Sequence, residues 1–361
     1  MPAEWEPHAA TWLAWPHNSS DWPGKYAPIP WVYAEIIRHL VPGEHVHLIV
    51  NDRKWEARAR SVLLSAHVPL DNLTFHHWRT DRGWLRDSGA IFVRPHASRA
   101  GTLDVGDQEH RKAAQVALSW RFTAWAKYAD WTYDCKIAKR MGGYLRMHTL
   151  LPAANGQRPT ASRRLILEGG AIDVNGCGSL LTTEECLLSS DVQVRNPGMT
   201  REGIEAAFRR YLGIQKTIWL KRGIVGDDTH GHVDDVARFV GSNTVVAAVE
   251  TDRKDPNYEL LRQNLESLQS ATDQDGRSLR IVELPMPSPV FFRGRRLPAS
   301  YANFYIANSA VLVPTFNDPS DCKALAILAN LFPDRSVTGI HSGDLIWGLG
   351  AIHCMTQQQP Q

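Results

Sequence analysis

The chain of 361 residues is 43% hydrophobic and 22% charged, and its 40 basic and 38 acidic side chains leave a formal net charge of +2. These values are ordinary for globular proteins, and they exclude disordered, collagen-like and coiled-coil chains as well as a global field for nucleic acid or anionic lipid. No apolar run reaches the roughly 18 residues of a membrane span, and residues 1–8 lack the features of a signal peptide. We therefore expect a cytoplasmic protein without a nucleic-acid or membrane partner.

The cysteines point to the same compartment. Cys135, Cys177, Cys186, Cys322 and Cys354 form no CxxC pair and no spacing typical of zinc sites. An odd number of cysteines in a chain without a signal peptide indicates reduced thiols. Cys177 and Cys186 could face each other across a hairpin, but the expected compartment argues against a disulfide.

The first half of the chain predicts regular elements up to residue 93 and then an irregular stretch. Apolar spacing indicates a helix over 31–40, a strand over 45–50, a helix over 53–66 and a strand over 89–93. Residues 94–116 are polar and contain two glycines and a proline, so we expect an inserted loop there.

The second half repeats one pattern about three times, namely two short strands, a helix and another strand. The predicted units are 172–174, 179–183, 201–211 and 216–220; then 236–240, 244–249, 258–268 and 279–284; and then 304–306, 310–313, 321–331 and 336–340. A period of roughly 40 to 60 residues is typical of repeat and propeller-like architectures. Five units would account for the whole chain, and because no linker is visible we expect one domain over 1–361.

Residues 226–235 form the densest cluster of chemically active side chains. This segment holds four carboxylates and two imidazoles in ten residues. If a strand starts at Gly231, His232 and Asp234 share one of its faces. A solvated acidic turn and a metal site are the alternatives, because His-x-His-x-Asp is a plausible ligand set. The segment alone does not choose between metal-dependent and metal-free chemistry.

Three shorter motifs are weaker signals when each is taken alone. Asp87, next to Arg86 ahead of a strand, is explained by a turn that opens the strand, with the two side chains on opposite faces. Glu168 ends an apolar run beside two glycines, where an unpaired carboxylate is costly, and this favours a site. Cys354 lies among small residues beside His353, and it is either a buried hydrophobe or a nucleophile.

Together these motifs resemble the agmatine deiminase family, which includes the bacterial type of peptidyl-arginine deiminase. The resemblance rests on segments 3–17, 84–89, 168–170, 181–187, 228–235, 297–304 and 352–360, in this order over nearly the full chain. It implies an α/β fold, the pentein fold, in which five strand–strand–helix–strand units form a pseudo-symmetric five-bladed propeller. It also implies a small-molecule guanidine substrate and no cofactor or metal. Dimers are common in the family, although the sequence contains no interface signature.

The resemblance assigns a role to each of five residues. Asp87 and Asp234 match the pair that binds the guanidinium, which is planar, cationic and suited to bidentate carboxylates. Cys354 matches the nucleophile and His232 the general acid and base, while Glu168 matches the carboxylate that orients this histidine. The implied reaction is hydrolysis of agmatine to N-carbamoylputrescine and ammonia through a covalent thiouronium, a step toward putrescine and the polyamines.

The residues that bind the substrate tail are less clearly defined. Trp84 is expected to flank the aliphatic chain, and Asp228 to meet a cationic end such as the ammonium of agmatine. Family members often carry Phe-Asn-Ala-Trp-Gly where this chain has Phe-Thr-Ala-Trp-Ala-Lys over 122–127. This departure, like the stretch 94–116, leaves agmatine, free arginine and peptidyl-arginine open as substrates.

Two other classes of function compete with this interpretation. A metal-dependent ureohydrolase would use His230, His232, Asp234 and Asp235 as ligands and release urea, but no second cluster with metal-ligand spacing supplies the remaining ligands. A non-catalytic binding protein on the same scaffold would be expected to lack the nucleophile, whereas Cys354 is present.

Overall fold

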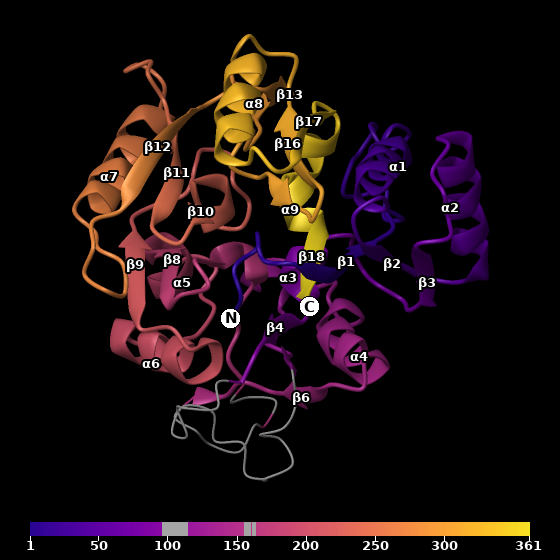
Figure 1. Ribbon diagram of the computed structural model, residues 1–361, viewed down its shortest axis with the longest axis horizontal. Helices are drawn as coiled ribbons and strands as arrows, with labels where there is room; N and C mark the ends of the chain where they lie inside the picture. Colours follow the sequence, from indigo (N-terminus) through magenta and orange to yellow (C-terminus); the bar gives the residue numbers. More distant parts are fainter. Residues whose placement is uncertain (96–114, 155–159, 161–163) are drawn as a thin grey trace.

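Five small mixed sheets and one hairpin make up the β-structure of the computed structural model, which describes residues 1–95, 115–154, 160 and 164–361 (Figure 1). The loop predicted over 94–116 falls mainly on residues 96–114, which lie outside the described residues. Within the described part of the chain, no helix is both long enough and apolar enough to cross a bilayer.

Four of the sheets share one topology, in which an antiparallel pair is followed by a helix and a third strand parallel to the second. The strands are β4 (Ile91–Val93), β5 (Val116–Leu118) and β6 (His148–Leu150); β7 (Asp173–Val174), β8 (Ser179–Thr183) and β9 (Lys216–Leu220); β10 (Ala237–Gly241), β11 (Thr244–Val249) and β12 (Arg280–Pro285); and β15 (Tyr305–Ile306), β16 (Ala310–Thr315) and β17 (Ser336–His341). The connecting helices are α4 (Ile137–Tyr144), α5 (Glu184–Leu188) with α6 (Arg201–Leu212), α7 (Asn257–Gln269) and α8 (Ser320–Leu331).

The fifth sheet joins the two ends of the chain. Its order is β18 (Thr356–Pro360), β1 (His8–Ala14), β2 (His45–Val50) and β3 (Leu73–His77), and α1 (Ile29–Leu40) and α2 (Arg53–Ser65) follow β1 and β2. The last strand runs antiparallel to the first, with Thr356 opposite Leu13. The C-terminal strand thus completes the N-terminal unit, and both termini lie near the middle of the molecule (Figure 1).

The predicted repeats are confirmed in their order and nearly in their boundaries. The helix α6 is a clear case, because the Thr200 side chain accepts from the Gly203 N–H at its start and Gly213, with φ of 75°, ends it in the left-handed region. Its apolar face, with Ile204, Phe208 and Leu212, is buried. The strand β11 is apolar from Val245 to Val249, because β10 and β12 pair with it on both edges and the helix α7 packs on it.

Short helical turns lie inside the ring of sheets, whereas the long helices lie outside (Figure 1). The turns are α3 (Leu85–Ser88), η5 (Gly169–Ala171), η6 (Val233–Asp235) and α9 (Ile352–Met355). The helix α3 packs against both α9 and η5, and η5 packs against η6. Each turn belongs to a different unit, so the centre brings together segments that are far apart in the sequence.

The strand expected from Gly231 onward is wrong. Residues Val233–Asp235 form the turn η6, and the strand β10 begins only at Ala237. The Asp227 side chain accepts from the N–H groups of Gly231 and His232, so these donors are not available to a sheet ladder. Arg86 and Asp87 lie in the short helix α3, which directly precedes the strand β4.

Candidate active site

Three of the predicted site side chains meet at Gly170. A Cβ atom placed on this glycine would lie 2.5 Å from His232 Nδ1, 3.0 Å from Asp234 Oδ2 and 3.0 Å from Asp87 Oδ1. Only a residue without a side chain fits there. Gly170, one of the two glycines beside Glu168, therefore lets the imidazole and the two carboxylates pack closely against the backbone.

Asp87 is held from two sides at the base of the site. Its Oδ1 accepts from the Gly170 N–H at 3.0 Å, and its Oδ2 accepts from Trp125 Nε1–H at 2.9 Å. Burial is the main cause that raises the pKa of Asp87, and the His232 imidazole partly opposes it. Arg86, one residue earlier, points instead to Glu4 at 3.1 Å. The two neighbours do serve different sides of α3, one structural and one in the site.

His232 lies between two carboxylates. Its Nδ1 is 3.9 Å from Asp87 Oδ1 and its Nε2 is 3.8 Å from Glu168 Oε2, and neither nitrogen has a hydrogen-bond partner among the described residues. Burial lowers the pKa of His232, but Asp87, Cys186 and Glu168 outweigh it and raise the pKa well above its usual value. The free imidazole nitrogens and a raised pKa suit a group that gives and takes protons.

A buried arginine stabilises the ionised form of Glu168. Burial alone would raise its pKa, but the Arg195 guanidinium, with Nε at 3.2 Å, is the main cause that lowers it to about 2. Arg195 also donates to the backbone carbonyls of Gln193 and Thr229. It therefore ties the charged Glu168 to the loop that carries His232.

Asp234 belongs to a second chain of buried charges. His353 Nδ1 is 2.7 Å from Asp234 Oδ2, and His353 Nε2 is 2.9 Å from Glu4 Oε2. Burial raises the pKa of Asp234, and His353 is the main cause that lowers it below its usual range. The other oxygen, Oδ1, is buried and has no partner among the described residues. This acceptor is free to bind a cation in the site.

Cys354 lies in α9 beside Asp234 and Asn303. Its Sγ is 3.7 Å from Asp234 Oδ2, and Asn303 Nδ2–H donates to it at 3.2 Å. Burial and then the carboxylates of Asp234, Asp235 and Asp87 raise the pKa of this thiol well above its usual value, while the Asn303 hydrogen bond lowers it. A cation bound beside this thiol would favour the thiolate, because an opposite charge stabilises the ionised form.

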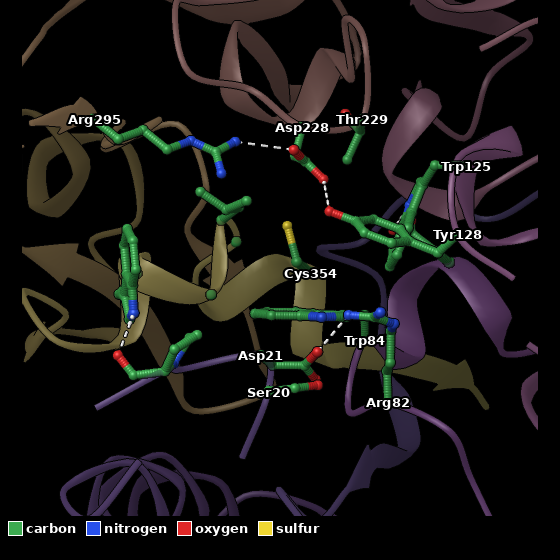
Figure 2. A pocket seen from close by; sticks show the side chains of 16 residues that line it. Ser20, Asp21, Arg82, Trp84, Trp125, Tyr128, Asp228, Thr229, Arg295 and Cys354 are labelled. Atoms are coloured by element: carbon green, nitrogen blue, oxygen red, sulfur yellow. Dashed lines mark hydrogen bonds and ion pairs between the residues drawn. The ribbon is translucent and has the colours of Figure 1, made fainter. Parts of the chain in front are cut away.

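A cavity of about 340 Å³ leads from the surface to Cys354. Trp84, Trp125 and Asp87 line its inner part, and Tyr128, Asp228 and Arg295 line its rim. Figure 2 shows the Cys354 sulfur facing the open space between Trp84 and the Asp228–Arg295 pair. The volume is that of a small-ligand pocket. Trp84 lines the cavity near the sulfur, and Asp228 lies farther out.

The metal ligand set of the competing interpretation does not form. In the ranges that the structure describes, the one group of three or more ligand atoms within 4.8 Å of one another is Glu168, Cys186 and His232. Of the four residues predicted for the ureohydrolase, only His232 belongs to it. The charge of Glu168 is already balanced by Arg195, so this group fits a metal poorly.

Comparison with known proteins identifies the family. The sequence model of the Porphyromonas-type peptidyl-arginine deiminases matches residues 1–360. The chain belongs to this family. It is similar to an agmatine deiminase from Medicago truncatula, with 34% identity over 100% of this chain and 96% of the relative. The resemblance read from the motifs is thereby confirmed.

Solved structures of the same class superpose over the whole chain. One is the agmatine deiminase of Enterococcus faecalis catalysing its reaction, with 29% identity, a TM-score of 0.84 and coverage of 100% of this chain and 95% of that one. Another is a cysteine-to-serine variant of the agmatine deiminase from C. jejuni with substrate bound, with 26% identity, a TM-score of 0.82 and coverage of 100% and 96%.

Sequence reasoning missed the residues that support the site. Asn303 lies inside a family motif but carries no charge to attract attention, and Arg195 lies in an irregular segment. Glu4, which accepts from Arg86, Arg238 and His353, is 349 residues from His353. Cys186 was considered only as a possible partner of Cys177, yet its thiol is near His232. Only the fold reveals these contacts, because each joins segments far apart in the chain.

Proposed function

We propose that the chain hydrolyses the C–N bond of a guanidinium substrate, releasing ammonia and a ureido product, with agmatine as the first candidate substrate. The observation that carries the proposal is that an imidazole and two carboxylates meet around Gly170, and one of these carboxylates, Asp87, lines the same cavity as the Cys354 thiol. Peptidyl- or free arginine, deiminated in the same way, is the second candidate. The names of the relatives support agmatine, and the family name supports peptidyl-arginine.

Binding of the guanidinium is proposed to fall to Asp87 and Asp234. The free Oδ1 of Asp234 and the second lone pairs of the Asp87 oxygens can each accept from a guanidinium N–H. The buried cation would offset the carboxylates that keep Cys354 protonated, because an opposite charge near a thiol favours its ionised form. Trp84 would cover the aliphatic part of the substrate at the cavity wall.

The chemical steps follow from the positions of Cys354 and His232. The Cys354 thiol releases its proton to solvent when the guanidinium binds, and the thiolate attacks the central guanidinium carbon and forms a C–S bond. His232 gives a proton to the departing nitrogen, whose C–N bond breaks so that it leaves as ammonia. The product of this step is a covalent thiouronium. His232 then takes a proton from water, the hydroxide attacks the same carbon, and the C–S bond breaks to release the urea-type carbonyl and the thiol. Glu168 holds the imidazole throughout.

The architecture is proposed to be a five-bladed α/β propeller, with residues 1–361 as a single catalytic domain. Support comes from the five sheets, four of which share one topology while the fifth is completed by the C-terminal strand. All five cysteines are free, which is typical of a reducing compartment and supports a cytoplasmic enzyme. The homodimer common in the family stays a prediction.

The test measures ammonia, ureido product and urea from agmatine, free arginine and a blocked arginyl peptide. Wild type, Cys354→Ser and Cys322→Ser are compared, each with and without a chelator; Cys322 is an exposed free cysteine and serves as the matched control. We expect ammonia and ureido product from wild type and Cys322→Ser, none from Cys354→Ser, and no effect of the chelator. Urea formation that survives Cys354→Ser and stops with the chelator would establish the ureohydrolase instead.

A further inference from the structure

The carboxylate of Asp228 at the cavity rim is already bound by cations of the protein itself. Its Oδ1 accepts from Lys127 Nζ at 2.7 Å and from Arg295 at 3.0 Å, and its Oδ2 accepts from the Tyr128 hydroxyl at 2.5 Å. Both oxygens are therefore engaged, and one negative charge faces two positive charges. An ammonium arriving here would compete with Lys127 and Arg295 and would be repelled by them.

The two cations keep unused donors at the rim. Among the described residues, each side chain donates one hydrogen bond, to Asp228, although a guanidinium has five N–H groups and an ammonium three. Lys127 and Arg295 are 39% and 47% exposed. Figure 2 shows the Arg295 guanidinium extending over the cavity on the side of Asp228, with the Cys354 sulfur below it. The rim thus offers free N–H groups to an anion.

The other carboxylate that lines the outer cavity is engaged through one of its oxygens. Arg82 donates to Asp21 Oδ1, whereas Asp21 Oδ2 is buried and has no hydrogen-bond partner among the described residues. Arg82 also pairs with Asp130. Asp228 therefore presents no free oxygen to an ammonium, and the one unpaired oxygen of Asp21 belongs to a carboxylate that already faces the Arg82 guanidinium.

We propose that Lys127 and Arg295 form an anion subsite, so that this chain prefers a guanidine whose tail ends in a carboxylate over agmatine, the first candidate named above. This inference rests on the proposed deimination at the other end of the cavity.

Three ligands with the same four methylene groups isolate the tail. Agmatine ends in an ammonium, 5-guanidinopentanoate in a carboxylate and pentylguanidine in a methyl group. Dissociation constants for all three are measured by calorimetry on Cys354→Ser, and kcat/KM on the wild type. Because each exposed ion pair contributes little, we expect 5-guanidinopentanoate to be favoured over agmatine by roughly tenfold, and less at high salt.

Charge removal at the rim then tests the named residues. In the double variant Lys127→Gln/Arg295→Gln, the preference for 5-guanidinopentanoate should fall by roughly tenfold, while pentylguanidine should change by about twofold or less. The matched control is Arg293→Gln, because Arg293 lies in the same turn, is exposed and does not line the cavity. This control should keep the wild-type preference.

The outcomes separate this inference from the proposed reaction. Equal or tighter binding of agmatine than of 5-guanidinopentanoate, or a preference unchanged in the double variant, would overturn the anion subsite even if agmatine is deiminated. If the predicted binding preference holds but no ligand is turned over by the wild type, the anion subsite stands and the proposed deimination fails.

Discussion

Replacing Asn303 by alanine tests how the nucleophile is prepared. The side chain donates to Cys354 Sγ at 3.2 Å and to Asp235 Oδ1 at 2.9 Å, and it is fully buried. A hydrogen bond to a charged group contributes about 1.5–3 kcal/mol. Loss of the bond to the thiolate should therefore raise the pKa of Cys354 by about one to two units and lower kcat/KM by about 10- to 150-fold.

The assay follows alkylation of Cys354 by iodoacetamide as a function of pH. Mass spectrometry of the peptide that carries Cys354 separates this thiol from the four other free cysteines. In Asn303→Ala the alkylation profile should shift to higher pH in parallel with the loss of activity. The matched control is Asn308→Ala, because Asn308 bonds to the His8 backbone and has no recorded contact with Cys354. Superimposable alkylation profiles for Asn303→Ala and wild type would refute the reasoning.

Three further substitutions test His232 as the proton carrier, the close packing at Gly170 and the buried carboxylate of Asp21. The charges of Glu168 and Asp87 keep the pKa of His232 high although the imidazole is buried. In Glu168→Gln, kcat/KM should therefore fall about 100-fold, and the basic limb of its pH profile should move to lower pH. A basic limb at the wild-type pH would contradict this reasoning. Gly170→Ala places a Cβ 2.5 Å from His232 Nδ1, so we expect little activity and a free energy of unfolding that is about 1–3 kcal/mol lower in urea. The control Gly143→Ala, which has open space around the added Cβ, should keep the wild-type activity and stability. Burial raises the pKa of Asp21 from 3.8 to about 7, so the folded state binds the carboxyl proton more tightly than the unfolded state does. This proton contributes up to about 4 kcal/mol to the free energy of unfolding below pH 4, and the contribution should be lost as the pH rises to 7. In Asp21→Asn, the stability measured by urea unfolding should fall less between pH 4 and pH 7 than in the wild type. Parallel plots of stability against pH for the two proteins would contradict the raised pKa of Asp21.

The outer elements of the fold could be predicted because their signals are local. The strands β8 and β11 and the helices α2 and α6 have the expected period, caps and turn residues within each segment. The strands β1 and β18 were not recognised as a pair, because the residues of β18, Thr-Gln-Gln-Gln-Pro, have no apolar alternation. Their pairing depends on a partner more than 340 residues away.

The candidate site was predictable by residue type and less so by local conformation. Cys354, His232 and Asp87 were found through motif resemblance, and the structure gathers them, but His232 and Asp234 converge through a turn rather than along one strand face. Asp228 shows most clearly what the sequence alone could not predict. A carboxylate in an acidic segment suggests a cation site, and only the fold brings Lys127 and Arg295 to it.

The charges around the cavity divide recognition between its two ends. At the inner end, burial and then the carboxylates of Asp234, Asp235 and Asp87 raise the pKa of the Cys354 thiol, so a bound guanidinium or a similar cation would favour the nucleophilic thiolate. This effect is independent of the substrate tail. At the outer end, Asp228 is buried, but its partners Lys127 and Arg295 are 39% and 47% exposed, so these two can change without disturbing the buried network. Selection of the reactive group thus depends on buried charge, whereas selection of the tail depends on partly exposed cations at the rim.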